Sequence, residues 1–285
     1  MEMETEKDRD QILEYYNSGK EIDRLLRGIG VIEWERSREI ISRYLSEEKM
    51  VIYDIGGGTG VYSRWLAELD HEVHMFELSP SNVQYARELQ ASGQISPIHR
   101  IEIADARSIA RVDDSADLIL LMGPLYHLPE KDERIAVLQE ALRVLKPGGT
   151  VIIAAISRFS STLWGLSVFG QQNNLIDDHV FMEMLEGELN EGQHIRPDKF
   201  PNFISRAFFH LPAELKSEIV AAGLTHIQTV AVEGPVWIVP AFAEKWEDTK
   251  SRETLLKISS LVENQESLLG MSPHMLAIAT KNTNT

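Results

Sequence analysis

The sequence of 285 residues predicts an α/β fold, a mostly parallel sheet with helices on both faces. Two observations predict it. Between residues 51 and 156, short apolar segments with strand composition alternate with segments of helical periodicity, which is typical of parallel strands joined by crossover helices. The later apolar segments are nearly continuous, as expected for strands that are buried on both faces of a sheet.

The individual elements follow from local signals. Ser79 caps a helix that has Pro80 in its first turn, directly after an expected strand. A later helix ends at the sequence LKPGG, because Pro147 and two glycines stop it. Strands are expected at 51–55, 72–77, 97–104, 116–122 and 150–156, and further strands near 224–234 and 273–281.

The pattern divides the chain into segments around this core. Helical spacing before the first strand indicates an N-terminal helical cover. After residue 156 the alternation breaks into an aromatic-rich region of helices and loops, which is typical of a lid, and it resumes near residue 211. The expected segments are a cover (1–50), a core (51–156), a lid insertion (157–210), and a completion of the core (211–285) with a second insertion at about 235–270.

Composition narrows the class of partner. A formal charge of −16 and a pI near 5.0 give no global attraction to nucleic acid or anionic lipid. The absence of cysteine excludes disulfides and cysteine metal sites and fits a reducing compartment. The first residues are acidic and polar, and no apolar run reaches the length of a membrane span. We expect a cytoplasmic monomer or homodimer that binds a small molecule, and neither nucleic acid nor membrane.

A glycine-rich turn follows the first expected strand, in the sequence VIYDIGGGTG. Glycine has no Cβ, so the backbone can turn sharply and approach a ligand closely. The dinucleotide fingerprint G-x-G-x-x-G does not fit, because Val61 stands where its third glycine belongs. An acid followed by alternate glycines does fit, as Asp54, Gly56, Gly58 and Gly60.

This pattern resembles the class I S-adenosylmethionine-dependent methyltransferases, and later positions extend the resemblance. Glu77 closes the second strand 21 residues after Gly56, where the family has an acid on the ribose diol. Asp105 follows the third strand, where the family has an acid near the adenine amine, and LKPGG is a common family signature. The resemblance implies S-adenosyl-L-methionine as cofactor and a Rossmann-like, seven-stranded sheet whose last strand is antiparallel.

The resemblance also implies where the cofactor lies, at the carboxyl ends of the strands. In many members that act on small molecules, an N-terminal helix with a tyrosine covers the cofactor. In this sequence that tyrosine would be Tyr16 or its neighbour Tyr15, and Arg24 would pair with the methionine carboxylate of the cofactor. The alternative is an amphipathic helix packed on the sheet edge. The expected cofactor-binding residues are Asp54, Gly56, Gly57, Gly58, Gly60, Glu77, Leu78, Asp105, Ala106, Met122, Tyr16 and Arg24.

The loop GPLYHL after the fourth strand, residues 123–128, is expected to face both cofactor and acceptor. His127 is the candidate general base, with the alternative that it only positions the loop, and Tyr126 is a candidate for the pocket wall. His194 and His210 are further catalytic candidates in and beside the lid insertion. The histidines show no metal-ligand spacing such as HxxxH, so no metal site is expected.

Three functions remain open. The first is methyl transfer, by in-line displacement, to O, N, S or C of a small and partly apolar molecule. GPLYHL, AFFHLPAEL and VEGP together resemble a group of bacterial methyltransferases, largely without assigned substrates, that is related to enzymes of small metabolites. The second is RNA or protein methylation, which the acidic charge disfavours. The third is a catalytically silent module for cofactor binding or assembly, which the intact cofactor motifs disfavour.

Overall fold

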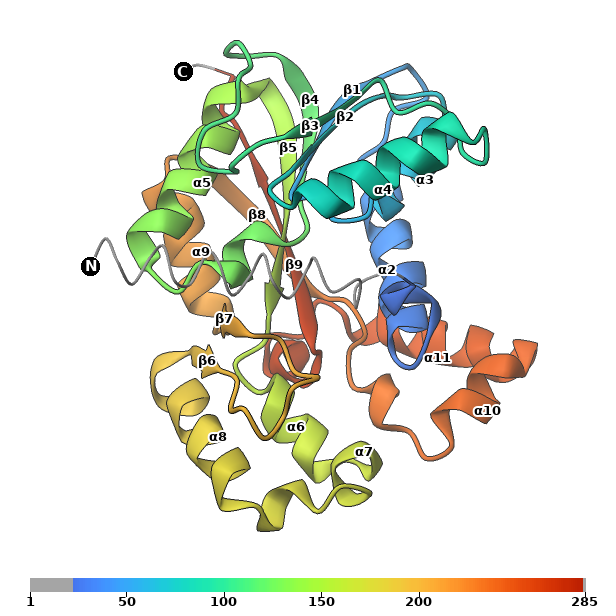
Figure 1. Cartoon of the computed structure of the whole chain (residues 1–285), viewed down its shortest axis with the longest axis vertical. Helices are drawn as coiled ribbons and strands as arrows, with labels where there is room; N and C mark the ends of the chain where they lie inside the picture. Colours follow the sequence, from blue (N-terminus) through green and yellow to red (C-terminus); the bar gives the residue numbers. More distant parts are fainter. Residues whose placement is uncertain (1–22, 284–285) are drawn as a thin grey trace.

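The expected sheet is present in the computed structural model of the protein, which describes residues 23–283 (Figure 1). The strands are β1 (Val51–Ile55), β2 (Glu72–Glu77), β3 (Arg100–Ile103), β4 (Ala116–Leu121), β5 (Leu145–Ile156), β8 (Thr225–Ala231) and β9 (His274–Thr280). They lie in the order β3-β2-β1-β4-β5-β9-β8, and β9 is antiparallel to both of its neighbours. The prediction of a Rossmann-like, mostly parallel sheet is confirmed.

Helices cover both faces because successive strand residues point to opposite sides. Ile119 and Leu120, adjacent in β4, belong to different hydrophobic clusters. The cluster of Leu120 includes residues of α2 (Gly30–Ser42), α3 (Val61–Glu68) and α4 (Pro80–Ala91). The cluster of Ile119 includes residues of α5 (Lys131–Val144) and α9 (Pro212–Ala221). Figure 1 shows α3 and α4 on one side of the sheet and α5 and α9 on the other.

Local signals set most of the element boundaries. The Ser79 hydroxyl accepts a hydrogen bond from the backbone N–H of Asn82 at 3.3 Å, so Ser79 caps α4 as predicted. The helix before LKPGG ends at Val144, also as predicted. The strand that follows begins at Leu145 rather than at residue 150, since LKPGG itself belongs to β5.

The segment after β5 forms a separate lobe below the carboxyl ends of the strands in Figure 1. It has a small core of its own around Phe181, Met184 and Leu185. Its two strands pair only with each other, and our expectation of helices and loops missed them, because three-residue strands leave no readable alternation. The elements are α6 (Ser160–Leu166), α7 (Val168–Gln171), η3 (Leu175–Asp177), α8 (His179–Glu191), β6 (Gln193–Ile195) and β7 (Arg206–Phe208).

The segment between β8 and β9 packs against α2. Phe242 and Leu255 share a hydrophobic cluster with Ile32 of α2, and Glu263 forms ion pairs with Arg36 and Arg43 of the same helix. The elements of this segment are η4 (Val236–Ile238), α10 (Phe242–Glu247), α11 (Thr249–Val262) and η5 (Glu266–Met271). Two further short helices are η1 (Arg24–Leu26), before α2, and η2 (Pro124–His127), between β4 and α5. Within residues 23–283, no helix has the length and apolar character needed to cross a membrane.

Candidate active site

A cavity of 380 Å³ lies at the carboxyl ends of β1, β2 and β4, the edge where open parallel sheets bind ligands. Among the expected site residues, those that line it are Arg24, Asp54, Gly56, Gly57, Gly58, Glu77, Leu78, Asp105, Ala106, Met122, Tyr126 and His127. Gly60 lies just beyond the lining, at the start of α3. Tyr16 and Tyr15 lie outside the described residues.

Backbone geometry explains the glycines of the turn. Gly56, Gly58 and Gly60 have φ angles of 75°, 57° and 79°, a region that side-chain-bearing residues rarely adopt. A Cβ on Gly56 would also lie 2.5 Å from Cγ of Pro124, which begins η2. The turn therefore brings the backbone against the η2 loop, and only glycine allows this close approach.

Glu77 is positioned by the glycine turn itself. The Gly58 N–H donates to its Oε2 at 2.9 Å and the Ser79 N–H to its Oε1 at 2.8 Å. The side chain is 7% exposed, and burial raises the pKa of its carboxyl. A carboxylate has about four acceptor positions, so each oxygen keeps one for a hydroxyl of a bound diol.

Asp54 lines the same cavity as Glu77 and has a buried carboxylate oxygen that can accept a hydrogen bond. The Ser63 hydroxyl donates to its Oδ2 at 2.6 Å, whereas Oδ1 is buried and has no hydrogen-bond partner within residues 23–283. Burial raises the pKa of this carboxyl to about 6, against the opposing hydrogen bond from Ser63. An unsatisfied buried acceptor is costly. An ammonium group in the cavity would donate to it, so this acceptor fits the methionine end of S-adenosylmethionine.

Asp105 is held by an arginine that our reading of the sequence missed. The Arg107 side chain donates to both carboxylate oxygens of Asp105, at 3.0 and 2.7 Å, and pairs with Glu133 as well. All three residues line the cavity. The sequence ADAR indicates this ion pair, because Arg107 follows Asp105 by only two residues.

Arg24 lines the cavity but already has a carboxylate partner. Its guanidinium donates to both oxygens of Glu33, at 2.5 and 2.8 Å. Burial would raise the pKa of Glu33, but Arg24 and His274 outweigh it and hold that pKa at about 2. In the expected pairing, a cofactor carboxylate would therefore share the Arg24 guanidinium with Glu33.

The η2 loop faces the cavity with two rings in contact. The Tyr126 hydroxyl donates to the carbonyl of Met122 at 2.9 Å, and the Tyr126 and His127 ring centroids lie 4.8 Å apart. Burial lowers the pKa of His127 to about 3. His127 is therefore neutral at physiological pH and a weak proton acceptor, which suits a hydrogen-bonding or positioning role better than general base catalysis.

His194 and His210 lie outside the cavity lining. His194 Nδ1 lies 2.6 Å from Glu188, and His210 Nε2 lies 3.2 Å from Glu218, so each imidazole is paired with a buried carboxylate. Glu218 also accepts hydrogen bonds from Arg134. Because Arg134 donates to the carbonyls of Leu128 and Pro129 in the cavity wall, this geometry gives His210 a supporting position rather than contact with the cavity.

Aromatic side chains of α2 and α3 complete one wall of the cavity. Trp34 lies 5.3 Å from Tyr62 and 6.2 Å from Trp65, measured between ring centroids. In the sequence, Trp34 has helical spacing to Ile41, a pattern that indicates burial and not contact with a ligand. The lining residues missed from the sequence include Trp34, Tyr62, Arg64, Trp65, Tyr85, Arg107 and Glu133.

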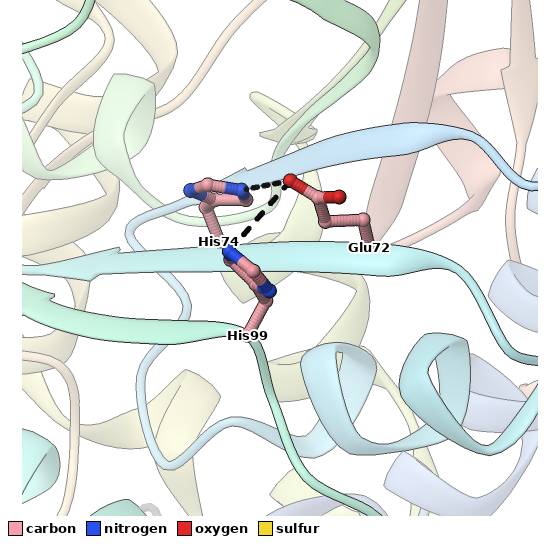
Figure 2. A group of neighbouring side chains, drawn as sticks. All are labelled: Glu72, His74 and His99. Carbon is pink, nitrogen blue, oxygen red and sulfur yellow. Dashed lines mark hydrogen bonds and ion pairs between the residues drawn. The ribbon is translucent and has the colours of Figure 1, made fainter.

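A group with metal-ligand donors lies at the opposite edge of the sheet, where β2 and β3 begin (Figure 2). Glu72 Oε1 is 3.0 Å from His74 Nε2 and 3.8 Å from His99 Nε2. Sequence spacing did not reveal this group, because His99 precedes a different strand. The buried Nδ1 of His74 has no partner within the described chain, so a metal on Nε2 would leave its second N–H unsatisfied.

Comparison with known proteins gives the same cofactor class. Residues 52–149 match a family model described as a methyltransferase domain. A ubiquinone biosynthesis O-methyltransferase of Chelativorans sp. is 28% identical over 160 residues, which are 56% of this chain and 58% of that protein. The ubiquinone/menaquinone biosynthesis C-methyltransferase UbiE of Neisseria meningitidis is 33% identical over 118 residues, 40% of this chain and 46% of that protein. The chain thus spans less than two thirds of these relatives' own length.

Solved structures share the fold over most of the chain. An S-adenosylmethionine-dependent methyltransferase of Methanosarcina mazei has a TM-score of 0.55 at 18% identity, covering 85% of this chain and 97% of that one. The cyclase SpnF has a TM-score of 0.54 at 17% identity, covering 87% and 80%. At such identities the likeness concerns the fold. Residues 52–149 thus match a methyltransferase domain, and the chain has the fold of solved S-adenosylmethionine-dependent methyltransferase structures.

Proposed function

We propose that the protein transfers a methyl group from S-adenosylmethionine to a small-molecule acceptor by in-line displacement. The observation that carries the proposal is that Glu77 and Asp54 both line the cavity beside the glycine turn. The Gly58 N–H in this turn donates a hydrogen bond to Glu77. Glu77 offers acceptors for the ribose hydroxyls, and Asp54 offers its orphaned Oδ1 to the ammonium group.

The other residues of the site have complementary tasks. Bound S-adenosylmethionine supplies a methyl group that its positive sulfur has already activated. The protein therefore mainly has to fix the orientation of the acceptor and exclude water. Met122, Tyr126 and His127, at the end of β4, are the residues we assign to this region of the cavity. Asp105 and Ala106 are assigned to the adenine end.

Several observations support a small acceptor. The cavity is walled by aromatic side chains, and the formal charge of −16 gives no global attraction to RNA. The two curated relatives named above carry O- and C-methyltransferase names from quinone biosynthesis. GPLYHL also resembles a bacterial group, largely without assigned substrates, that is related to enzymes of small metabolites. RNA or protein methylation is the less favoured alternative.

A label-transfer assay tests this function. The purified full-length chain is incubated with methyl-labelled S-adenosylmethionine and with matched small-molecule, RNA and protein fractions of a bacterial lysate. We expect label in the small-molecule fraction, and at least tenfold less with Glu77→Ala. Label confined to RNA or protein would contradict the small acceptor. Cofactor binding without label in any fraction would favour a catalytically silent module.

A further inference from the structure

Two imidazoles and a carboxylate converge where β2 and β3 begin, at the end of the sheet opposite the cavity (Figure 2). Glu72 and His74 are two residues apart on β2, so their side chains project from the same face of the strand. His99 comes from the chain just before β3, and the next residue, Arg100, pairs with His74 in the parallel ladder. The pairing of the two strands therefore brings the three side chains together.

The separations of the candidate ligand atoms fit a tetrahedral metal ion. Zinc binds imidazole nitrogen and carboxylate oxygen at about 2.0–2.1 Å, so two of its ligand atoms lie about 3.3–3.4 Å apart. Glu72 Oε1 is 3.0 Å from His74 Nε2 and 3.8 Å from His99 Nε2, which brackets this separation. All three atoms lie within 4.8 Å of one another. Small rotations of the side chains would thus complete the triangle of ligands.

Hydrogen bonding accounts for only one of the two imidazoles. The 3.0 Å separation between His74 Nε2 and Glu72 Oε1 is that of a hydrogen bond, whereas the 3.8 Å separation from His99 is too long for one. Within residues 23–283 no hydrogen bond reaches the His99 ring. Figure 2 nevertheless shows both imidazoles directed at the same carboxylate oxygen. A cation between them would bind both nitrogens and the oxygen at once.

The Nδ1 atom of His74 does not decide against a metal ion, because it lacks a partner within the described chain in either case. A carboxylate only accepts, so in the hydrogen-bonded pair Nε2 carries the proton and Nδ1 is an unpaired acceptor. With a metal ion on Nε2, the proton is on Nδ1, which is then an unpaired donor. The missing outer partner lowers the affinity instead, since such partners contribute about 10- to 100-fold to metal binding.

The group is accessible to ions in solution. The side chains of Glu72 and His99 are 35% and 51% exposed, so an ion can reach them and keep a water ligand. Two nearby cations, Arg100 and Arg111, are paired with Glu102, which reduces their repulsion of a metal ion. The surroundings therefore permit a divalent cation at this end of the sheet.

We propose that Glu72, His74 and His99 bind a zinc ion, with water as the fourth ligand. Imidazole and carboxylate ligands suit zinc, and its tetrahedral geometry matches the measured separations. Glu72 lies five residues before Glu77 on β2, about 17 Å away along the strand, so the ion does not contact the cavity. The ion joins β2 to the start of β3, the edge strand of the sheet, and stabilises this edge independently of methyl transfer.

Calorimetry with zinc chloride tests the proposal on the full-length chain, after removal of any histidine tag and of bound metal by a chelator. His99→Ala and Glu72→Gln each remove one ligand at a partly exposed position. His179→Ala is the matched control, because His179 is an exposed histidine at the start of α8, outside the group. We expect wild type and His179→Ala to bind one zinc ion with micromolar affinity. We expect the two ligand variants to bind it at least tenfold more weakly.

Thermal unfolding gives a second readout, since an ion that binds the folded chain stabilises it. Zinc at about 100 times its Kd should raise the Tm of wild type and His179→Ala by about 4 °C, and that of His99→Ala by less than about 1 °C. The affinity of His99→Ala for S-adenosylhomocysteine should equal that of the wild type. Equal zinc affinities of wild type and His99→Ala would overturn the proposal, as would a wild-type Tm that zinc does not raise.

Discussion

The backbone N–H of Gly58 donates to Oε2 of Glu77 at 2.9 Å, which joins the glycine turn after β1 to the acid at the end of β2. The two features that identify the cofactor class in the sequence are therefore one unit in space. The carboxylate shapes the turn, and the turn fixes the carboxylate at the wall of the cavity.

The first prediction concerns Glu77. We expect Glu77→Ala to weaken the binding of S-adenosylhomocysteine by about 10- to 100-fold, since hydrogen bonds to a charged group contribute about 1.5–3 kcal/mol. Calorimetry measures the change. The matched control is Glu72→Ala, at the opposite end of the same strand, which should bind as the wild type does. Equal affinities of the two variants would remove Glu77 from the site.

Asp54 should couple stability to pH. Its pKa is raised from 3.8 to about 6 in the folded chain, so its ionisation costs about 3 kcal/mol of folding free energy above pH 6, and this cost vanishes below pH 4. We therefore expect Asp54→Asn to raise the free energy of unfolding at pH 7 and to leave it nearly unchanged at pH 4. Urea unfolding at the two pH values measures this.

The same substitution should impair ligand binding. Asp54→Asn removes the charge that we assign to the ammonium group, so S-adenosylhomocysteine should bind at least tenfold more weakly at pH 7. A variant that is both more stable and equally able to bind would show that the buried charge has no role in the site.

The glycine turn gives a graded prediction. A Cβ at Gly58 meets no heavy atom within 4 Å, so Gly58→Ala should cost only the backbone strain of about 1–2 kcal/mol. Gly56→Ala should cost more, because its Cβ would also lie 2.5 Å from Pro124. Urea unfolding compares the two variants, and a smaller loss for Gly56→Ala would contradict the close approach of the turn to η2.

His127 should not determine the pH dependence of the reaction. Its pKa of about 3 keeps it neutral throughout the range in which methyl transfer is measured. We expect His127→Asn to leave S-adenosylhomocysteine affinity within about threefold and to leave the acid limb of the rate profile in place. An acid limb that disappears in His127→Asn would return His127 to the role of general base.

The sheet was predictable because each strand has its signal within a few consecutive residues. The apolar runs of β1, β2, β4 and β5 and the cap at Ser79 are local features, and the structure has them where the sequence indicates. The short strands β6 and β7 were missed, since they pair over a hairpin of irregular chain and carry no alternation of their own.

The site was predictable only where the motif is contiguous or tied to a strand end. Asp54 and Glu77 belong to that class, and both line the cavity. Trp34 and Tyr62 do not, because they lie on α2 and α3 and meet at the cavity wall only when these helices pack on the sheet. His194 resembled a catalytic candidate in the sequence, but its carboxylate partner and burial depend on the folded lobe.

The most direct test of the account is calorimetry of the full-length protein with S-adenosylmethionine and S-adenosylhomocysteine, beside Glu77→Ala. The account predicts micromolar binding of both ligands to the wild type and at least tenfold weaker binding to the variant. An absence of binding to a folded wild-type chain, or equal binding by both proteins, would contradict the assignment of the cavity to this cofactor.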